Sequence, residues 1–244
     1  YFRFSRLQVS LHGDLKDWFN LSFKNLMKRL LFRISLPRID LLRFVSNTQM
    51  HVADSLFNFG RNEKVVCPIP IQAWRGFDRK PRAEKTLGFV GRAHKERGVT
   101  EWIEIARALP DFDYSVIGDG PLLDDFRKSL SSARILGKLS HVETLEAYSD
   151  LSVLLSCAPY ESYGLTIREA LLMGVPVVTR NTAGVQDLLK QFPEIIKSYS
   201  TIDEGIARVR ELSSLKTNAQ FEVFTKLFQD EQNMSLRRLV SHWL

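Results

Sequence analysis

Hydrophobic and polar positions in the second half of the chain follow a regular order. Short apolar runs predict strands, and each run precedes a stretch with apolar residues at helical spacing. The expected strands are Thr86 to Val90, Tyr114 to Ile117, a short one at Ile135, Leu151 to Cys157, Val177 to Thr179 and Glu194 to Lys197. The expected helices are Val99 to Leu109, Leu122 to Leu130, one opened by the capping-box pattern Ser140-His-Val-Glu143, one after Gly164, and Val185 to Lys190. This order predicts a doubly wound parallel sheet, a Rossmann-like domain.

The first part of the chain has a sparser pattern. Strand-like runs at Leu7 to Leu11, Phe44 to Ser46 and Lys64 to Cys67 are separated by helical stretches, and Ala219 to Leu244 reads as helix. We therefore expect an α/β protein in three parts: residues 1–75, a nucleotide-binding domain over 76–212, and C-terminal helices over 213–244.

The segment after the predicted strand Leu151 to Cys157 carries the most specific chemistry. A loop with Glu161 leads to Gly164, which opens a helix containing Glu169. A helix N-terminus at the carboxyl end of a parallel strand offers backbone amides and the positive end of a dipole, which favours a phosphate at Gly164, Leu165 and Thr166. Carboxylates would repel a phosphate, so we expect Glu161 and Glu169 to accept hydrogen bonds from hydroxyls on either side of it. A diphosphate flanked by sugar and ribose hydroxyls is a nucleotide sugar.

At Ala158-Pro-Tyr-Glu161-Ser-Tyr-Gly164 and on through Glu169-Ala to Gly174-Val-Pro-Val-Val178, the chain resembles the retaining glycosyltransferases of the GT-B fold. Their signature is a glutamate, seven residues and a second glutamate, set among a proline, an aromatic residue and a glycine. The resemblance implies that Glu161 contacts the transferred sugar and that Glu169 contacts the ribose. It also implies a GT-B-like fold, in which the Rossmann-like domain follows an N-terminal Rossmann-like domain whose opening strands have no counterpart here.

The same resemblance assigns further site residues. Arg92, after the first strand of the Rossmann-like domain, and Arg97, where the family has lysine, would grip the donor diphosphate. Leu139 falls in the segment that holds the nucleobase through backbone groups. His12, at the end of a predicted strand, resembles the family's histidine near the reaction centre, although a lone histidine at a strand end is as often structural.

Charge and composition leave several partners open. The chain has 244 residues and a formal net charge of +6, which admits an anionic ligand, an anionic membrane surface or nucleic acid. The densest basic stretch, Lys24 to Arg43, has the pattern of a basic amphipathic helix interrupted at Pro37. It could lie on an anionic leaflet or pack its apolar face on its own domain. Cys67 and Cys157 lie far apart in strand-like runs and predict core residues in a reducing compartment, not a disulfide.

We therefore predict a retaining, metal-independent glycosyltransferase that moves a sugar from a nucleoside diphosphate sugar to an acceptor hydroxyl, on a glycan, a lipid-linked molecule or another acceptor. No cofactor and no nucleic-acid partner are expected, and the location is cytoplasmic, with a peripheral position at the inner face of the membrane left open. An epimerase of the same fold does not match the segment from Pro159 to Glu169. The alternative from another class is a non-catalytic protein that keeps the nucleotide pocket and binds a membrane or a partner.

Overall fold

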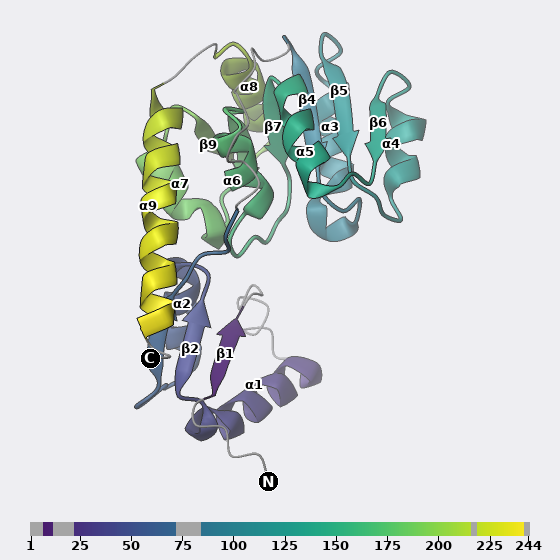
Figure 1. The fold of residues 1–244 in the computed structure, drawn as a ribbon. Coiled ribbons are helices and arrows are strands. Elements are labelled where there is room, and N and C mark those ends of the chain that lie inside the picture. Colours follow the sequence, from purple (N-terminus) through teal and green to yellow (C-terminus); the bar gives the residue numbers. More distant parts are fainter. Residues whose placement is uncertain (1–6, 12–21, 72–83, 216–218, 242–244) are drawn as a thin grey trace. The chain divides into compact units, whose positions relative to one another are not determined.

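The computed structural model describes residues 7–11, 22–71, 84–215 and 219–241 (Figure 1). The chain divides into two compact units. The first comprises Tyr1–Pro70, Glu161–Tyr163 and Phe228–Leu244, and the second comprises Ile71–Tyr160 and Gly164–Leu227. None of the described helices combines the length and the hydropathy that crossing a membrane requires.

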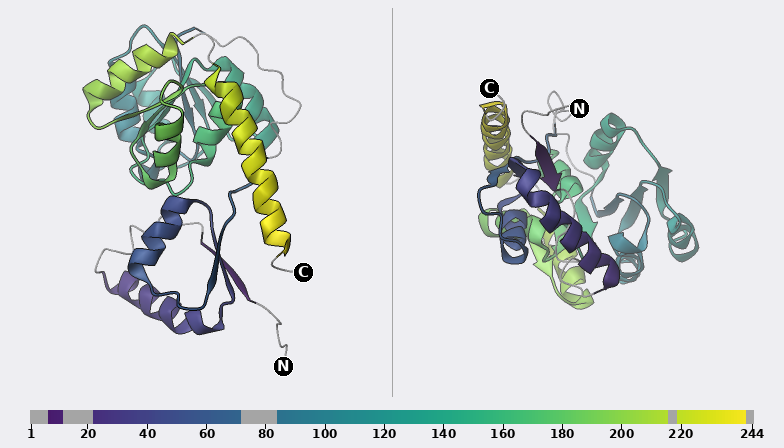
Figure 2. Two further views of the ribbon diagram at one scale, coloured as in Figure 1. Left: turned by 90° about the vertical axis from the view of Figure 1, so that its left-hand side faces the viewer. Right: turned by 90° about the horizontal axis from the view of Figure 1, so that it is seen from below.

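The first unit is built on a parallel sheet of three strands in the order β1-β2-β3. Its elements are β1 (Gln8–Leu11), α1 (Phe23–Ser35), β2 (Leu41–Phe44), α2 (Asn47–Leu56) and β3 (Glu63–Val66). Both helices lie on the same face of this sheet (Figure 2). Leu42 and Phe44 of β2 pack there against Ala53 and Leu56 of α2, with Phe32 of α1 at the margin of the cluster.

The expected strand Phe44 to Ser46 is placed too far along the sequence. The observed strand β2 ends at Phe44, and the chain has left the sheet at Val45. Ser46 is the N-cap of α2, and its side chain accepts a hydrogen bond of 3.1 Å from the Gln49 N–H. The Gln49 side chain in turn accepts a hydrogen bond of 3.0 Å from the Val45 N–H. This local capping satisfies backbone groups that a longer strand would otherwise have paired.

The second unit contains a parallel sheet of six strands in the order β6-β5-β4-β7-β8-β9. Its strands are β4 (Thr86–Val90), β5 (Asp113–Ile117), β6 (Arg134–Gly137), β7 (Val153–Ser156), β8 (Val177–Arg180) and β9 (Ile196–Tyr199). Its helices are α3 (Val99–Arg107), α4 (Leu123–Ser129), α5 (His141–Ala147), α6 (Leu165–Leu172), α7 (Gln186–Gln191) and α8 (Ile202–Ser213). The prediction of a doubly wound parallel sheet is confirmed, and the capping box at Ser140 is present.

Helices cover both faces of this sheet (Figure 1). Residues of α3, α4 and α8 share one large core cluster in which the buried Trp102 contacts both Phe89 and Phe126 edge-on. On the opposite face, α6 packs on β7 and β8. The expected last strand, Glu194 to Lys197, is displaced: the N–H groups of Ile195 and Ile196 both donate to the Phe192 carbonyl in a turn, so pairing with β8 begins only at Ile196.

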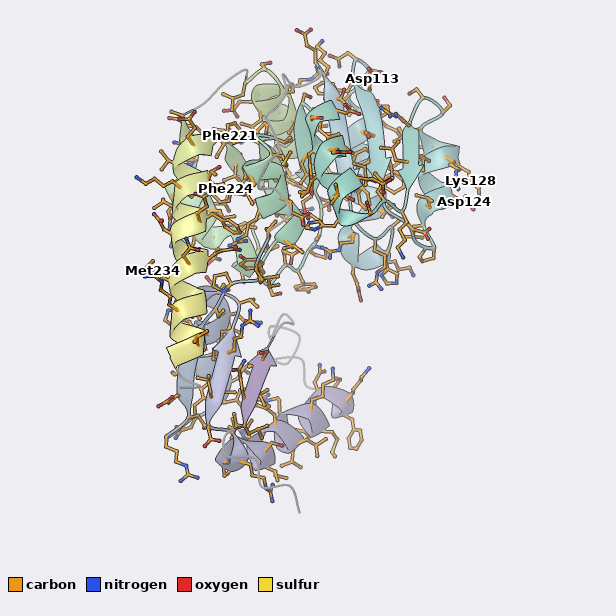
Figure 3. All side chains as sticks on the ribbon, viewed as in Figure 1. Asp113, Asp124, Lys128, Phe221, Phe224 and Met234 are labelled. Atoms are coloured by element: carbon orange, nitrogen blue, oxygen red, sulfur yellow. The ribbon has the colours of Figure 1, made fainter. Side chains whose placement is uncertain are left out.

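The long helix α9 (Gln220–Ser241) has residues in both units. Its first turns belong to the second unit: Phe221 and Phe224 are buried, and Phe224 lies edge-on to Phe192 with 5.3 Å between ring centroids. Figure 3 shows both aromatic rings pointing away from the face that carries Met234. Further along, the Gln232 side chain donates to the Ile69 carbonyl within the first unit.

Gly98 and Gly137 offer a matched test of how tightly the second unit is packed. Both have left-handed backbones, with φ of 66° and 70°. A Cβ on Gly98 would collide with the backbone carbonyl of Cys157, whereas a Cβ on Gly137 would meet nothing within 4 Å.

We expect Gly137→Ala to reduce the free energy of unfolding by about 1–2 kcal/mol, because only the left-handed backbone is penalised. Gly98→Ala should reduce it by about 3 kcal/mol or more, because a backbone clash adds to the same penalty. Urea unfolding followed by circular dichroism measures both. Equal losses in the two variants would show that the contact with the Cys157 carbonyl relaxes freely.

Candidate active site

The two central strands of the second sheet define where a ligand can bind. β4 and β7 are neighbours, yet from β4 the chain moves outward to β5 and from β7 it moves outward to β8. Connections that leave in opposite directions open a crevice at the carboxyl ends of the two strands, the usual ligand site in such sheets. The loop after β4 carries Arg92 and Arg97, and the loop after β7 leads to Gly164.

The N-terminus of α6 forms one wall of this site. Gly164 is the N-cap, with φ 73° and ψ 57°, a left-handed conformation that glycine adopts without strain. The first N–H groups of a helix have no intrahelical acceptor and point outward along the axis. Leu165 is exposed and Thr166 half-buried, whereas Ile167 and the rest of α6 are buried. This end of α6 can therefore receive an anion.

Glu169 lies on the same helix, one turn further in, and is 4% exposed. His141 Nε2 lies 2.9 Å from one carboxylate oxygen, Oε1. The Tyr148 hydroxyl lies 3.3 Å from the other, Oε2, and also 3.0 Å from the Thr166 carbonyl. Burial raises the pKa of the Glu169 carboxyl, while the contacts with His141 and Tyr148 oppose that rise. The site thus holds a desolvated carboxylate fixed at both oxygens.

The two predicted cations follow β4. Arg92 is exposed and forms an ion pair of 3.0 Å with Glu96. Arg97 is half-buried in the short 3₁₀ helix Lys95–Arg97, which His94 caps by accepting from the Glu96 N–H. An exposed pair such as that of Arg92 with Glu96 is worth about 0–1 kcal/mol, so a diphosphate can compete for the arginine.

A polar cluster behind the site fixes the N-terminal half of α3. Glu101 accepts two hydrogen bonds from Arg180 of β8, at 2.8 and 2.6 Å, and another from the Tyr199 hydroxyl of β9. Arg180 also donates to the Ser200 carbonyl at 2.7 Å. Because a bidentate arginine fixes both distance and angle, the loop that carries Arg97 leads into a rigid helix.

Backbone hydrogen bonds join the carboxyl ends of β4, β5 and β6 next to the site. The Gly91 N–H donates to the Ile117 carbonyl, and the Gly118 N–H donates to the Gly137 carbonyl. A Cβ on Gly118, whose φ is 130°, would collide with the Gly91 carbonyl. The glycine turn after β5 is therefore required by the packing of these loops. Leu139, the predicted base-contact residue, is half-buried just after β6.

Two predicted site residues stand apart from this group. Glu161 belongs with the first unit, where the neighbouring Ser162 carbonyl accepts from Ser46 at 3.4 Å and the Tyr163 hydroxyl donates to the Ile69 carbonyl. Its contact with the transferred sugar stays a prediction. His12 lies outside the described residues, so its role also stays a prediction.

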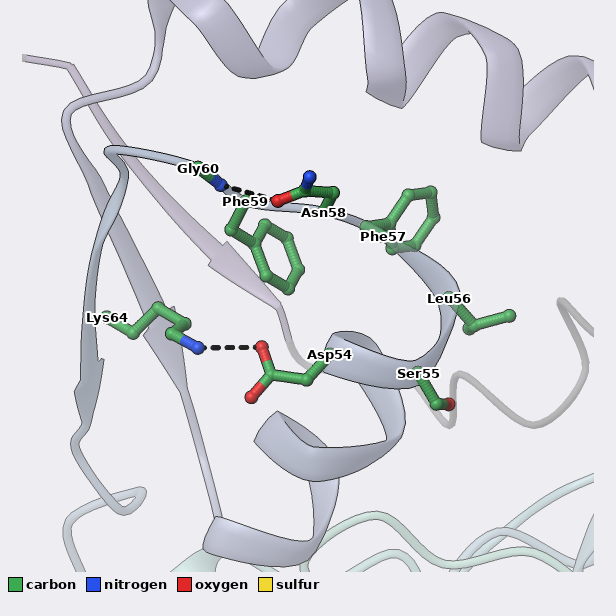
Figure 4. Close-up of a pocket in the computed structure, with 8 residues that line it drawn as sticks. All are labelled: Asp54, Ser55, Leu56, Phe57, Asn58, Phe59, Gly60 and Lys64. Carbon is green, nitrogen blue, oxygen red and sulfur yellow. Dashed lines mark hydrogen bonds and ion pairs between the residues drawn. The ribbon is translucent and has the colours of Figure 1, made fainter.

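The first unit has a surface depression of about 500 Å³ at residues 54–60 and Lys64 (Figure 4). Lys64 crosses it to Asp54 at 2.8 Å, and its ammonium lies 5.7 Å from the Phe59 ring centroid. The depression lies between the end of α2 and the start of β3, so it is at the amino ends of the strands. Ligands of open parallel sheets bind at the opposite, carboxyl ends, and we assign this depression no role in the chemistry.

Comparison with known proteins identifies the family. The family model for glycosyl transferases group 1 matches residues 70–222. The chain belongs to this family. A GDP-mannose-dependent alpha-mannosyltransferase of Mycolicibacterium smegmatis is 26% identical over 147 residues, 59% of this chain and 39% of that protein. A glycogen synthase of Mycobacterium tuberculosis is 32% identical over 143 residues, 53% of this chain and 34% of that protein. The matches span well under two thirds of these curated relatives.

Solved structures share the fold at low sequence identity. TarM of S. aureus, crystallised with UDP and other ligands, has a TM-score of 0.76 at 13% identity, covering 97% of this chain and 50% of that one. Anabaena HepE in complex with UDP and glucose has a TM-score of 0.74 at 16% identity, covering 97% and 72%. The prediction of a GT-B-like α/β fold is confirmed.

Sequence reasoning missed the two residues that contact Glu169. Neither His141 nor Tyr148 was predicted as a site residue. A usable signal was present: the two residues lie seven positions apart, at the start and just past the end of a short helix opened by a capping box, so they lie on one face two turns apart.

The raised pKa of Glu169 predicts that this residue lowers stability. A carboxyl whose folded-state pKa lies above its ordinary value is penalised in the native state when it is ionised. That penalty is present at neutral pH and disappears as the pH falls through the raised folded-state pKa. Glu169→Gln should therefore raise the free energy of unfolding at neutral pH, by about 0.5–1 kcal/mol. The gain should shrink as the pH falls toward the ordinary value of 4.5.

Thermal unfolding of Glu169→Gln across this pH range, beside the exposed Glu146→Gln as control, measures the effect. A gain that does not depend on pH, or a gain of the same size in the control, would contradict the assignment of a buried ionised carboxylate.

Proposed function

We propose that this chain is the donor-binding part of a retaining glycosyltransferase that moves a sugar from a nucleoside diphosphate sugar to an acceptor hydroxyl. The observation that carries the proposal is the pairing, on one helix, of an anion-receiving N-terminus at Gly164 and the buried carboxylate of Glu169. Both lie beyond β7, at the point where the strand order of the sheet reverses. A diphosphate and a ribose have the charges and hydroxyls that match these two features.

Glu169 suits a vicinal diol. Each carboxylate oxygen has two lone pairs. His141 and Tyr148 approach one oxygen each, which leaves acceptor capacity on both for hydroxyls. A buried, ionised acceptor binds hydroxyl donors more strongly than an exposed one, because water does not compete for it. The ribose hydroxyls of a nucleotide would supply those donors.

Arg92 and Arg97 would act on the departing diphosphate. Breaking the anomeric bond develops negative charge on the leaving oxygen, and groups placed in advance to meet this charge lower the barrier. Arg92 would exchange its exposed pair with Glu96 for the phosphate. Glu161 would orient the sugar, attack would come from the face of departure, and no metal ion is assigned a role. The configuration of the product, read by NMR, tests this retention.

The curated relatives and the structures of the same fold support this reading and leave the donor open. The mannosyltransferase is named for GDP-mannose, whereas TarM and HepE were crystallised with UDP. The segment from Gly137 to Leu139 would meet the base through backbone groups, which do not fix its identity. Which sugar is transferred and which acceptor receives it depend on regions of the relatives that this chain matches only in part.

Isothermal titration of this chain with UDP and GDP tests the donor site. We expect at least one of the two nucleotides to bind, and Glu169→Ala to weaken that binding by about 1.5–3 kcal/mol, the range for hydrogen bonds to a charged group. Glu146→Ala, on an exposed position of α5, is the control and should leave binding unchanged. Failure of both nucleotides to bind, or full affinity in Glu169→Ala, would overturn the proposed donor site.

A specific observation also favours a peripheral position on a membrane surface. Six of the seven apolar residues of α1 follow the spacing i, i+3, i+4, i+7, i+8, i+11, and these six are exposed: Phe23, Leu26, Met27, Leu30, Leu31 and Ile34. The helix meets the described part of its own unit through other residues, with Phe32 edge-on to Phe57 at 4.8 Å and Arg33 donating to the Leu56 carbonyl. The exposure of this face among the described residues supports a membrane surface, and not the rest of its own unit, as its partner.

The charges of α1 match an anionic leaflet. Lys24, Lys28, Arg29 and Arg33 lie on this helix, which contains no acidic residue. On a helical wheel, Lys24 and Arg33 flank the apolar stripe on opposite sides, where long basic side chains reach lipid headgroups while the stripe inserts. We therefore assign α1 an anionic bilayer surface as its partner.

Flotation with vesicles tests this assignment. The protein should bind vesicles of equal parts phosphatidylglycerol and phosphatidylcholine and not vesicles of phosphatidylcholine alone. Because each basic residue contributes about 1 kcal/mol at such a surface, Lys24→Gln with Lys28→Gln should weaken binding by about 2 kcal/mol. Leu31→Glu with Ile34→Glu should abolish it, while Val223→Glu, at an exposed apolar position of α9, should not. Absent binding, or equal binding to both vesicle types, would refute it.

A further inference from the structure

We propose that His141 is a positioning residue for Glu169, which keeps this carboxylate ionised and oriented and so sets the lower pH limit of nucleotide binding. This inference rests on the proposed function of Glu169 as a ribose ligand. It goes further by adding a residue and a pH dependence to that site.

The geometry places one short helix alongside the carboxylate. His141 is the first residue of α5, and Tyr148 follows its last residue, so the two side chains leave the same face two turns apart. His141 Nε2 holds Oε1 of Glu169 at 2.9 Å, and the Tyr148 hydroxyl is 3.3 Å from Oε2. His141 and Tyr148, at the two ends of α5, therefore contact one carboxylate oxygen each, and the carboxylate cannot rotate without losing one of these partners.

The position of His141 is itself fixed. The Ser140 side chain accepts from the Glu143 N–H, and the Glu143 carboxylate accepts from the Ser140 N–H at 2.8 Å. This reciprocal cap sets the first turn of α5 and the direction in which His141 leaves it. Leu139, in the predicted base-contact segment, lies two residues earlier. A nucleotide that engages this segment and Glu169 would thus contact the backbone next to His141 and the carboxylate that His141 holds.

Tyr148 and His141 contribute differently. Tyr148 is fully buried, and burial together with the nearby Glu169 raises the pKa of its hydroxyl well above the ordinary value, so it stays neutral. Its single proton is shared between Glu169 and the nearer Thr166 carbonyl at 3.0 Å. The His141 side chain is 49% exposed, and its hydrogen bond and positive charge lower the pKa of the Glu169 carboxyl beside it.

Other charges do not replace His141 in the described part of the chain. The groups that act on the Glu169 carboxyl there are His141 from α5 and Tyr148 from the following turn. Arg168, the neighbour of Glu169 on α6, directs its guanidinium to the Gly184 carbonyl at 3.1 Å. Without His141, burial would act on the carboxyl with only a shared tyrosine proton to oppose it. Glu169 would then become protonated at a higher pH, and a neutral carboxyl is a weaker acceptor for ribose hydroxyls.

The experiment measures the Kd of UDP and of GDP by isothermal titration between about pH 5 and 8, the range in which histidine titrates. His141→Ala should weaken binding about three- to tenfold at neutral pH, the loss typical of one hydrogen bond. Its affinity should also begin to fall at a higher pH than that of the parent. His141→Gln can still donate a hydrogen bond but carries no charge, so it should restore affinity at neutral pH and not at acid pH. His51→Ala, an exposed histidine on α2, should reproduce the parent profile.

Two further measurements separate the possible failures. Thermal unfolding of each variant shows whether the fold is intact. Tyr148→Phe should lower stability and shift the pH profile less than His141→Ala does, because the Tyr148 proton is shared with the Thr166 carbonyl. If the parent chain binds neither nucleotide, the proposed function fails. If the parent binds and Glu169→Ala does not, but His141→Ala keeps the parent affinity and pH profile, then only the role of His141 is refuted.

Discussion

The parallel pairing of β4 with β7 is the constraint on which the second unit depends. These strands are brought together from opposite halves of the sheet, and their register is fixed where Ser152 bridges them: its hydroxyl donates to the Thr86 carbonyl at 3.0 Å and accepts from the Thr86 N–H at 2.9 Å. The contact is so close that a Cβ on Gly88 would collide with the Leu151 side chain. Without this pairing the loop with Arg92 and the helix with Glu169 would have no common edge.

Glu169 shows how such a site trades stability for chemistry. A buried carboxylate is penalised for leaving water, and two donors offset that penalty only in part, as the raised pKa of the group shows. An apolar residue or a glutamine would be compatible with the same helix. Retaining a desolvated, fixed acceptor at the crevice is reasonable when its partners are hydroxyls, since these do not bring a countercharge. By contrast, the cluster of Glu101, Arg180 and Tyr199 satisfies its charges internally, and it serves as scaffold.

The sequence predicted the second sheet well because its inner strands β4, β7 and β8 are largely buried, which makes each one a short, mostly apolar run. Prediction was weaker where local hydrogen bonding decides the boundary. Ser46 reads equally well as a strand residue and as a helix cap, and Ile195 as strand or turn; the choice depends on which backbone groups find partners. The roles of Glu169 and Arg92 were predicted by resemblance, but burial and ion pairing were not, because they depend on side chains from other elements.

The apolar residues of α1 mark a different limit of sequence reading. Their spacing predicts an amphipathic helix, and such a helix normally turns its apolar stripe inward. Periodicity shows that a stripe exists but not which side of the helix meets the sheet. In the structure Phe32, which lies opposite the stripe, is the residue that joins the core of the first unit, and it does so because the edge of its ring meets Phe57. This aromatic contact and the hydrogen bond from Arg33 to the Leu56 carbonyl hold the polar side of α1 against its own unit, and the wider apolar stripe, flanked by cations, is exposed.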